Sequence, residues 1–284
     1  MRLLPIILIL AVLLYGTVVA GLFLFQRRLL YLPDAHPPDP EQLGLRGIEV
    51  MRPVADDGTP LLAWYAKPSH DDGYAVLFLH GNAGHIGDRE DQMRRMRRLG
   101  WGVLMLEYRG YGGNPGKPTE DGLRRDARAG LAALRALGIP PGRILLWGES
   151  LGTGLAIGLA SEQPANEPNV AAVLLESPYT SIAATAQFHY PYVPARWLIH
   201  DKFDSLSRIS RVRAPIFIMQ GTLDRIVPPM MGRALLAAST APAEIWTVPG
   251  AGHNDLTGAG AIEAAGDFVS RLPSMAVQGL HPRE

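Results

Sequence analysis

The sequence predicts an α/β fold with a mostly parallel central sheet, helices on both faces of that sheet, and an apolar N-terminal helix. Short apolar runs of strand length alternate with helical segments from about residue 74 onwards, which is typical of parallel strands joined by helices. Residues 3–25 carry no charge, and a helix of that length covers about 34 Å, enough to cross a bilayer core. Hydrophobic residues make up 47% of the 284 residues, which fits a globular domain with a sizeable core.

The individual strands and helices follow from the positions of the apolar runs and of the turn residues between them. Strands are expected at 48–52, 61–67, 74–80, 101–108, 144–147, 170–175, 215–220 and 244–248. Helices are expected at 88–99, 119–137, 151–160, 229–238 and 259–271.

The segment 177–213 interrupts the alternation of strands and helices. It is rich in aromatic residues and proline, and it is too long for an ordinary connection. One interpretation is a lid insertion over the functional site, with Tyr179, Phe188 and Trp197 as candidate substrate contacts. The other is an irregular helical insertion that only packs on the domain, and the sequence leaves both open.

The expected organisation is an N-terminal membrane anchor (1–28), a proline-rich linker (29–45), the main α/β domain (46–273) and a tail (274–284). A cleaved signal peptide is the alternative to the anchor. Its apolar region should span only about 7–15 residues and end in a small-residue cleavage site. Residues 18–20 form a poor site and the apolar run continues past them, which favours a single-pass membrane protein. The few flanking charges leave the orientation open, with an extracytoplasmic domain slightly favoured.

Composition and charge narrow the function classes. The formal net charge is zero, so nothing indicates a nucleic-acid partner. The five arginines between residues 89 and 98 follow acidic residues at a helix start, which is typical of a solvated helix face. The chain has no cysteine, which excludes disulfides, zinc–thiolate sites and cysteine nucleophiles. His80 and His85 lack a third ligand in a known metal pattern, so we expect no metal and no cofactor, and the oligomeric state is left undetermined.

Residues 148–152 form a G-x-S-x-G pattern between an expected strand and an expected helix. A sharp strand-to-helix turn with serine at its apex needs these glycines, because side chains there would collide across the turn. The pattern therefore presents the Ser150 hydroxyl at the carboxyl edge of a sheet. A glycine-rich loop that happens to contain serine is the alternative, and the flanking strand and helix argue against it.

Three polar residues, Ser150, Asp224 and His253, each follow a different expected parallel strand. The carboxyl ends of parallel strands share one edge of the sheet, so these residues can converge. Serine is a poor nucleophile at neutral pH and needs an adjacent base, which His253 can supply. Asp224 would then fix the imidazole tautomer. The order Ser…Asp…His is the one expected for an α/β-hydrolase.

Each assignment in this triad has an alternative. Asp224 could cap the helix that follows it, and His253 could be an ordinary turn residue. Glu176 and Asp255 also follow strands and could replace Asp224 as the acid.

An oxyanion hole requires two backbone N–H groups. One is expected from Leu151, directly after the nucleophile. The other is expected from the loop at 80–84, where Asn82 is the first choice and Ala83 the alternative.

Six motifs together resemble the α/β-hydrolases of the bud-emergence-protein type, which include membrane-anchored bacterial members and eukaryotic protein depalmitoylases. They are His-Gly-Asn-Ala-Gly at 80–84, Tyr-Arg-Gly-Tyr-Gly at 108–112, Gly-Glu-Ser-Leu-Gly at 148–152, Glu-Ser-Pro-Tyr-Thr at 176–180, Gly-Thr-Leu-Asp at 221–224 and Gly-His at 252–253. The resemblance covers about residues 29–272 and implies an α/β-hydrolase fold and a serine hydrolase acting on esters, thioesters or amides. Glu149 departs from the family, in which relatives often carry arginine at this position.

The sequence therefore predicts a serine esterase or thioesterase that forms an acyl-enzyme on Ser150 and takes a small-molecule or lipid-like acyl substrate. Two alternatives remain. An aminopeptidase-like amidase would need an acidic anchor for the substrate amine, for which Glu149 and Glu176 are the candidates. A catalytically idle scaffold would need neither the triad nor the oxyanion loops.

Overall fold

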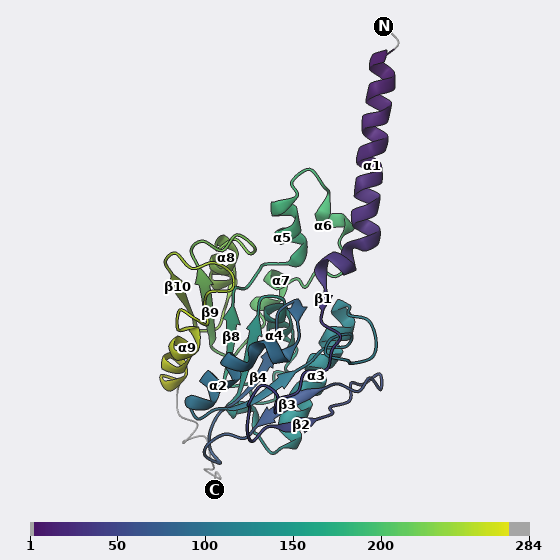
Figure 1. Ribbon diagram of the computed structural model, residues 1–284. Helices are drawn as coiled ribbons and strands as arrows, with labels where there is room; N and C mark the ends of the chain where they lie inside the picture. Colours follow the sequence, from purple (N-terminus) through teal and green to yellow (C-terminus); the bar gives the residue numbers. More distant parts are fainter. Residues whose placement is uncertain (1–2, 273–284) are drawn as a thin grey trace.

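The computed structural model describes residues 3–272 and confirms the predicted α/β architecture (Figure 1). The main sheet has eight strands, of which β3 runs antiparallel to both neighbours while the other neighbouring pairs are parallel. From one edge to the other the strands are β10 (Ala243–Val248), β9 (Ile216–Gly221), β8 (Ala172–Glu176), β7 (Ile144–Glu149), β4 (Ala75–Leu79), β6 (Gly102–Leu106), β3 (Ala63–Ala66) and β2 (Glu49–Met51).

The central strands are apolar and buried, as expected where helices cover both faces of a parallel sheet. One face packs against α3 (Glu120–Ala136), α4 (Leu151–Ser161) and α8 (Met230–Ala238). The other face packs against α2 (Glu90–Arg98) and α9 (Ala261–Ser270). Two short 3-10 helices, η1 (Ile86–Arg89) and η2 (Pro141–Arg143), precede α2 and β7.

The insertion at 177–213 contains three short helices, α5 (Ile182–His189), α6 (Ala195–Leu198) and α7 (Leu206–Ile209). The side chain of Ser181 starts α5 by accepting a hydrogen bond from the N–H of Ala184 at 2.9 Å. α5 and α6 pack against each other and form a hairpin that rises from the sheet beside α1 (Figure 1). We call residues 182–198 the α5–α6 hairpin.

The N-terminal helix α1 (Leu3–Leu30) projects away from the sheet and its side chains are mostly exposed (Figure 1). It is long and apolar enough to cross a membrane, a property that a signal sequence near the N-terminus shares. The segment 29–45 is expected to be a linker, but part of it belongs to the folded domain, because β1 (Leu32–Pro33) pairs with β5 (Ala83–Gly84). The tail expected at 274–284 lies outside the described residues.

Candidate active site

The nucleophile candidate Ser150 lies at the tight turn between β7 and α4. Its φ of 48° and ψ of −110° are strained for a residue with a side chain, as a nucleophile elbow requires. The two glycines are needed for space. A Cβ on Gly152 would collide with the carbonyl of Leu79, and one on Gly148 would meet the carbonyl of Gly152. Substitution at either glycine would therefore force the turn open.

The structure brings Ser150, Asp224 and His253 together from the ends of β7, β9 and β10. His253 Nε2 lies 2.9 Å from the Ser150 hydroxyl oxygen, and His253 Nδ1 lies 2.7 Å from Asp224 Oδ2. With the proton on Nδ1 donated to Asp224, Nε2 is free to accept the proton of the serine hydroxyl. This is the geometry of a nucleophile, a base and an orienting acid.

Asp224 also holds its own loop. The N–H groups of Ile226 and Val227 donate to Asp224 Oδ1 at 2.9 and 2.8 Å. Oδ1 therefore stabilises the loop, whereas Oδ2 contacts His253. Burial alone would raise the pKa of Asp224, but the hydrogen bond and charge of His253 and the two N–H donors outweigh it and lower the pKa. The carboxylate therefore stays ionised beside the imidazole.

The two rival acids have other partners. Asp255 Oδ2 accepts the N–H of Gly252 at 2.7 Å and so shapes the loop that carries His253. Glu176 Oε2 accepts the indole N–H of Trp147 at 3.2 Å. Burial and then the neighbouring Glu149 charge raise the pKa of Glu176 to about 8, which leaves it mostly protonated at neutral pH.

The two oxyanion-hole candidates, Asn82 and Leu151, line the same cavity as Ser150, whereas the alternative Ala83 lines a second cavity on the other side of the serine. The Asn82 side chain donates to the carbonyl of Leu30 at 2.8 Å, and the carbonyl of Asn82 accepts from the Tyr111 hydroxyl at 2.8 Å. The loop that carries Asn82 is thus fixed from both sides.

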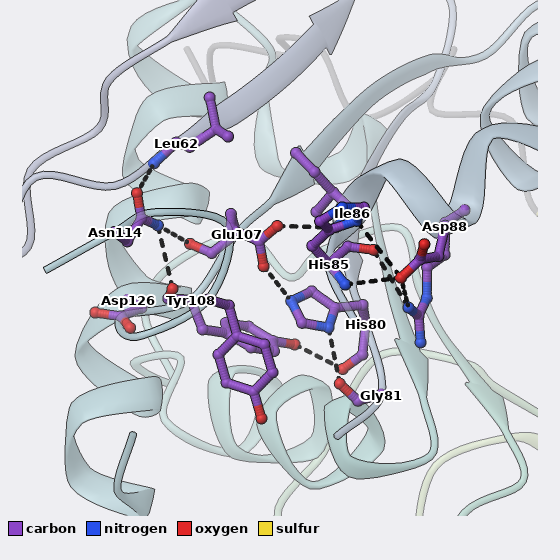
Figure 2. Close-up of polar contacts among 12 residues, drawn as sticks. Leu62, His80, Gly81, His85, Ile86, Asp88, Glu107, Tyr108, Asn114 and Asp126 are labelled. Carbon is purple, nitrogen blue, oxygen red and sulfur yellow. Dashed lines mark hydrogen bonds and ion pairs between the residues drawn. The ribbon is translucent and has the colours of Figure 1, made fainter. Parts of the chain in front are cut away.

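A buried polar network also stabilises the loop that carries Asn82 (Figure 2). His80 and Glu107 are both fully buried, with His80 Nε2 at 2.9 Å from Glu107 Oε1. The other Glu107 oxygen accepts the N–H of Ile86 at 2.8 Å, and the Tyr108 hydroxyl donates to the carbonyl of His80 at 2.9 Å. His80 Nδ1 lies 2.7 Å from the carbonyl of Gly81 and can only donate to it. His80 is therefore a structural residue of the loop.

Arg89 and Glu149 form a further clamp on this loop, and the sequence did not reveal it. Arg89 Nη2 lies 2.8 Å from Glu149 Oε1, and Nη1 donates to the carbonyls of Ala83 and His85 at 2.9 and 3.2 Å. The Arg89 side chain is 12% exposed, so its assignment to a solvated arginine cluster is wrong. Burial would raise the pKa of Glu149, but Arg89 outweighs it and lowers the pKa.

Two cavities meet at Ser150. The apolar cavity, about 320 Å³, is lined mainly by residues of the insertion, of the loop after β9 and of α1. Its apolar lining consists of Leu30, Leu151, Tyr179, Ile182, Ala186, Tyr190, Ile226 and Val227. The polar cavity, about 480 Å³, lies on the other side of Ser150 and is lined by Ala83, Gly84, Asp88, Arg89, Gln92, Glu149, Glu176, Ser177, His253, Asn254 and Thr257.

Of the three candidate substrate contacts, only Tyr179 lines the apolar cavity; its hydroxyl donates to the carbonyl of Leu151 at 3.0 Å. Phe188 and Trp197 line neither cavity and are 54% and 82% exposed. The structure therefore does not support them as cavity contacts, because the hairpin lines the apolar cavity with a different face. That face carries Ile182 and Ala186, whose spacing of four residues on a helix could have identified it.

Comparisons with known proteins identify relatives of this chain and solved structures with the same fold. A family model described as serine aminopeptidase S33 matches residues 72–208. An uncharacterized protein of Mycobacterium tuberculosis is 41% identical over 257 residues, 89% of each chain. Human alpha/beta hydrolase domain-containing protein 17B is 32% identical over 82% of this chain and 76% of its own. An esterase of Pyrococcus furiosus shares the fold with a TM-score of 0.67, at 19% identity, over 86% of this chain and 98% of its own.

Proposed function

Because this chain belongs to the α/β-hydrolase superfamily, we propose that it is a serine hydrolase that cleaves carboxylic esters or thioesters through an acyl-enzyme on Ser150. The observation that carries the proposal is the pair of contacts of His253, at 2.9 Å to the Ser150 hydroxyl and 2.7 Å to Asp224. The strained backbone of Ser150 supports it, because such strain persists where function uses it.

In the first half of the reaction, the Ser150 oxygen attacks the carbonyl carbon while His253 Nε2 takes the hydroxyl proton. The N–H groups of Asn82 and Leu151 receive the developing oxyanion. The tetrahedral intermediate then collapses, and His253 returns its proton to the leaving alcohol or thiol. In the second half, His253 deprotonates a water molecule that attacks the acyl-enzyme, and Ser150 is released with its proton.

Each of the two cavities would bind one half of the substrate. The apolar cavity takes the acyl chain and the polar cavity takes the leaving group. We further propose that α1 is retained as a membrane anchor, because its uncharged run is longer than the apolar region of a signal peptide.

An aminopeptidase-like amidase is the second candidate, favoured by the description of the matching family model. It would need an ionised carboxylate free to bind an amine. Glu149 is already paired with Arg89, and Glu176 has a pKa of about 8, so neither offers one at neutral pH. This argument favours esters and thioesters. An idle scaffold is disfavoured, because it would need no hydrogen-bonded triad.

A substrate panel tests the proposal. We expect the purified full-length protein to hydrolyse p-nitrophenyl octanoate and an octanoyl thioester, and to leave aminoacyl p-nitroanilides almost untouched. Faster turnover of the anilides than of the esters would establish the amidase instead. No turnover of any of the three, by a protein that is folded by circular dichroism, would favour the idle scaffold.

A further inference from the structure

The apolar cavity beside Ser150 adjoins a second apolar cavity. This outer cavity, about 330 Å³, shares four lining residues with the first: Leu30, Ile182, Ala186 and Tyr190. Its remaining lining comes from α1 and from the α5–α6 hairpin with the segment after it, namely Leu22, Phe23, Gln26, Leu29, Val193, Ala195, Leu198 and Ile199. The two apolar cavities together therefore extend from the nucleophile to the side of α1.

Polar contacts fix α1 against the other wall of this path. Arg27 binds Asp201 through two hydrogen bonds, at 2.8 and 3.2 Å. The Gln26 amide donates to the carbonyl of Leu198 at 3.2 Å and accepts the N–H of His200 at 2.8 Å. Asp201 also accepts the N–H of Glu120 at the start of α3, so the contact extends to the body of the domain. α1 is thus a docked element and not a free tether.

The hairpin reaches far along α1. The Tyr15 hydroxyl donates to the carbonyl of Tyr192 at 2.7 Å, and Tyr15 lies twelve residues, or about 18 Å of helix, before Arg27. Figure 1 shows the hairpin standing beside this part of α1. Tyr192 and Trp197 are 87% and 82% exposed, and such amphipathic rings are favoured at membrane interfaces. If α1 spans a bilayer, the hairpin tip and the outer cavity lie at the level of the lipid.

We infer that the two apolar cavities form one channel for the acyl chain of a membrane-resident ester or thioester, with α1 as one wall and the α5–α6 hairpin as the other. The inference rests on the proposed function and adds its substrate class: an acyl group presented from the bilayer and not from solution. The polar part of the substrate would lie in the polar cavity, on the far side of Ser150.

The inference predicts a dependence on chain length. A butyryl group fits in the cavity beside Ser150, whereas a palmitoyl group has to extend past Leu30 into the outer cavity. Each buried methylene contributes about 0.8 kcal/mol, close to fourfold in binding. Blocking the outer cavity should therefore penalise palmitoyl substrates and spare butyryl ones.

Two substitutions block the outer cavity from opposite walls: Leu22→Trp in α1 and Val193→Trp in the hairpin. Leu24→Trp is the matched control, because Leu24 lies on the exposed side of α1 and lines none of these cavities. Tryptophan is compatible with a membrane helix, so the pair in α1 differs in the direction of the ring and not in its chemistry.

The measurement is kcat/KM for p-nitrophenyl butyrate and palmitate, with full-length protein in phosphatidylcholine nanodiscs. We expect both blocking variants to lose about tenfold or more on palmitate, since losing two buried methylenes has roughly that effect, and less than twofold on butyrate. Leu24→Trp should match the wild type on both esters. Undiminished palmitate turnover in both blocking variants, or equal losses on both esters, would overturn the channel. Absence of turnover of both esters in the wild type would instead overturn the proposed function.

Discussion

The two cavities that meet at Ser150 differ in how their walls are held. The wall of the polar cavity contains charged side chains that pair with each other, such as Arg89 with Glu149, and it lies on the sheet and α2. The apolar wall comes from an insertion and from α1, which are joined by few polar contacts such as Arg27 with Asp201. In the proposed mechanism, the polar side would position the reacting groups, whereas the apolar side would select the acyl chain.

The largest effect is expected at the centre, where both sides depend on the same triad. Asp224→Asn should lower kcat about 10⁴-fold, because asparagine would hold His253 in the wrong tautomer. Glu176→Gln and Asp255→Asn are the matched controls and should each cost less than about tenfold. The measurement is kcat on p-nitrophenyl octanoate. If Glu176→Gln instead lost most of its activity, the orienting acid would be Glu176 in the polar cavity, and the contrast between the two walls would fail.

On the polar wall, Glu149→Gln should lower kcat about tenfold for every acyl length and change KM little. The substitution removes the charged partner of Arg89, which holds the carbonyls of Ala83 and His85 in the oxyanion loop. Asp91→Asn is the control, because Asp91 pairs with Arg95 on the exposed face of α2. The measurement is kcat and KM on butyryl and octanoyl esters. A loss confined to octanoyl esters would show that Glu149 acts on chain selection.

On the apolar wall, kcat/KM should rise from acetyl to octanoyl esters, and Ile182→Ala should lower octanoyl turnover about tenfold while sparing acetyl turnover. Ile182 lines both apolar cavities. Trp197→Ala is the control and should leave the profile unchanged in detergent solution, because Trp197 points outwards. A wild-type preference for acetyl esters, or a flattened profile in Trp197→Ala alone, would contradict this division of roles.

The smallest effect concerns stability. The pKa of Glu176 is raised from 4.5 to about 8, first by burial and then by the Glu149 charge. An acid whose pKa is higher in the folded protein loses its stabilising effect as pH rises from the unfolded to the folded value, here between about 4.5 and about 8. Glu176→Gln removes this dependence.

We therefore expect the Tm of Glu176→Gln, relative to wild type, to be higher at pH 8 than at pH 5 by a few degrees. Thermal unfolding in detergent at the two pH values measures it. An equal difference at both pH values would mean that Glu176 is ionised at neutral pH, and the polar cavity could then bind an amine.

The triad and the sheet were predictable from sequence because their signals are local. Ser150, Asp224 and His253 each follow a strand, and the parallel sheet brings strand ends to one edge whatever their separation along the chain. Arg89 was not predictable, since its charge also suits a helix face. Its role depends on Glu149, sixty positions away.

The walls of the apolar cavity were predictable only in part. The composition of the insertion predicts a possible lid, but the aromatic rings of Phe188 and Trp197, which suggest substrate contacts, are largely exposed. Leu30 could not be found, because it reaches the cavity only through the docking of α1 on residues some 170 positions later, such as Asp201. Contacts of that kind leave no periodic pattern in the sequence.

The central claim is that Ser150 is the nucleophile, and covalent labelling tests it most directly. Full-length protein treated with a fluorophosphonate and digested should carry one adduct, located by mass spectrometry on the serine at position 150. Ser150→Ala should remain unlabelled and lose octanoyl ester hydrolysis by about 10⁴ to 10⁶. An adduct on another serine, or a Ser150→Ala variant that keeps more than about a tenth of the wild-type rate, would contradict the account.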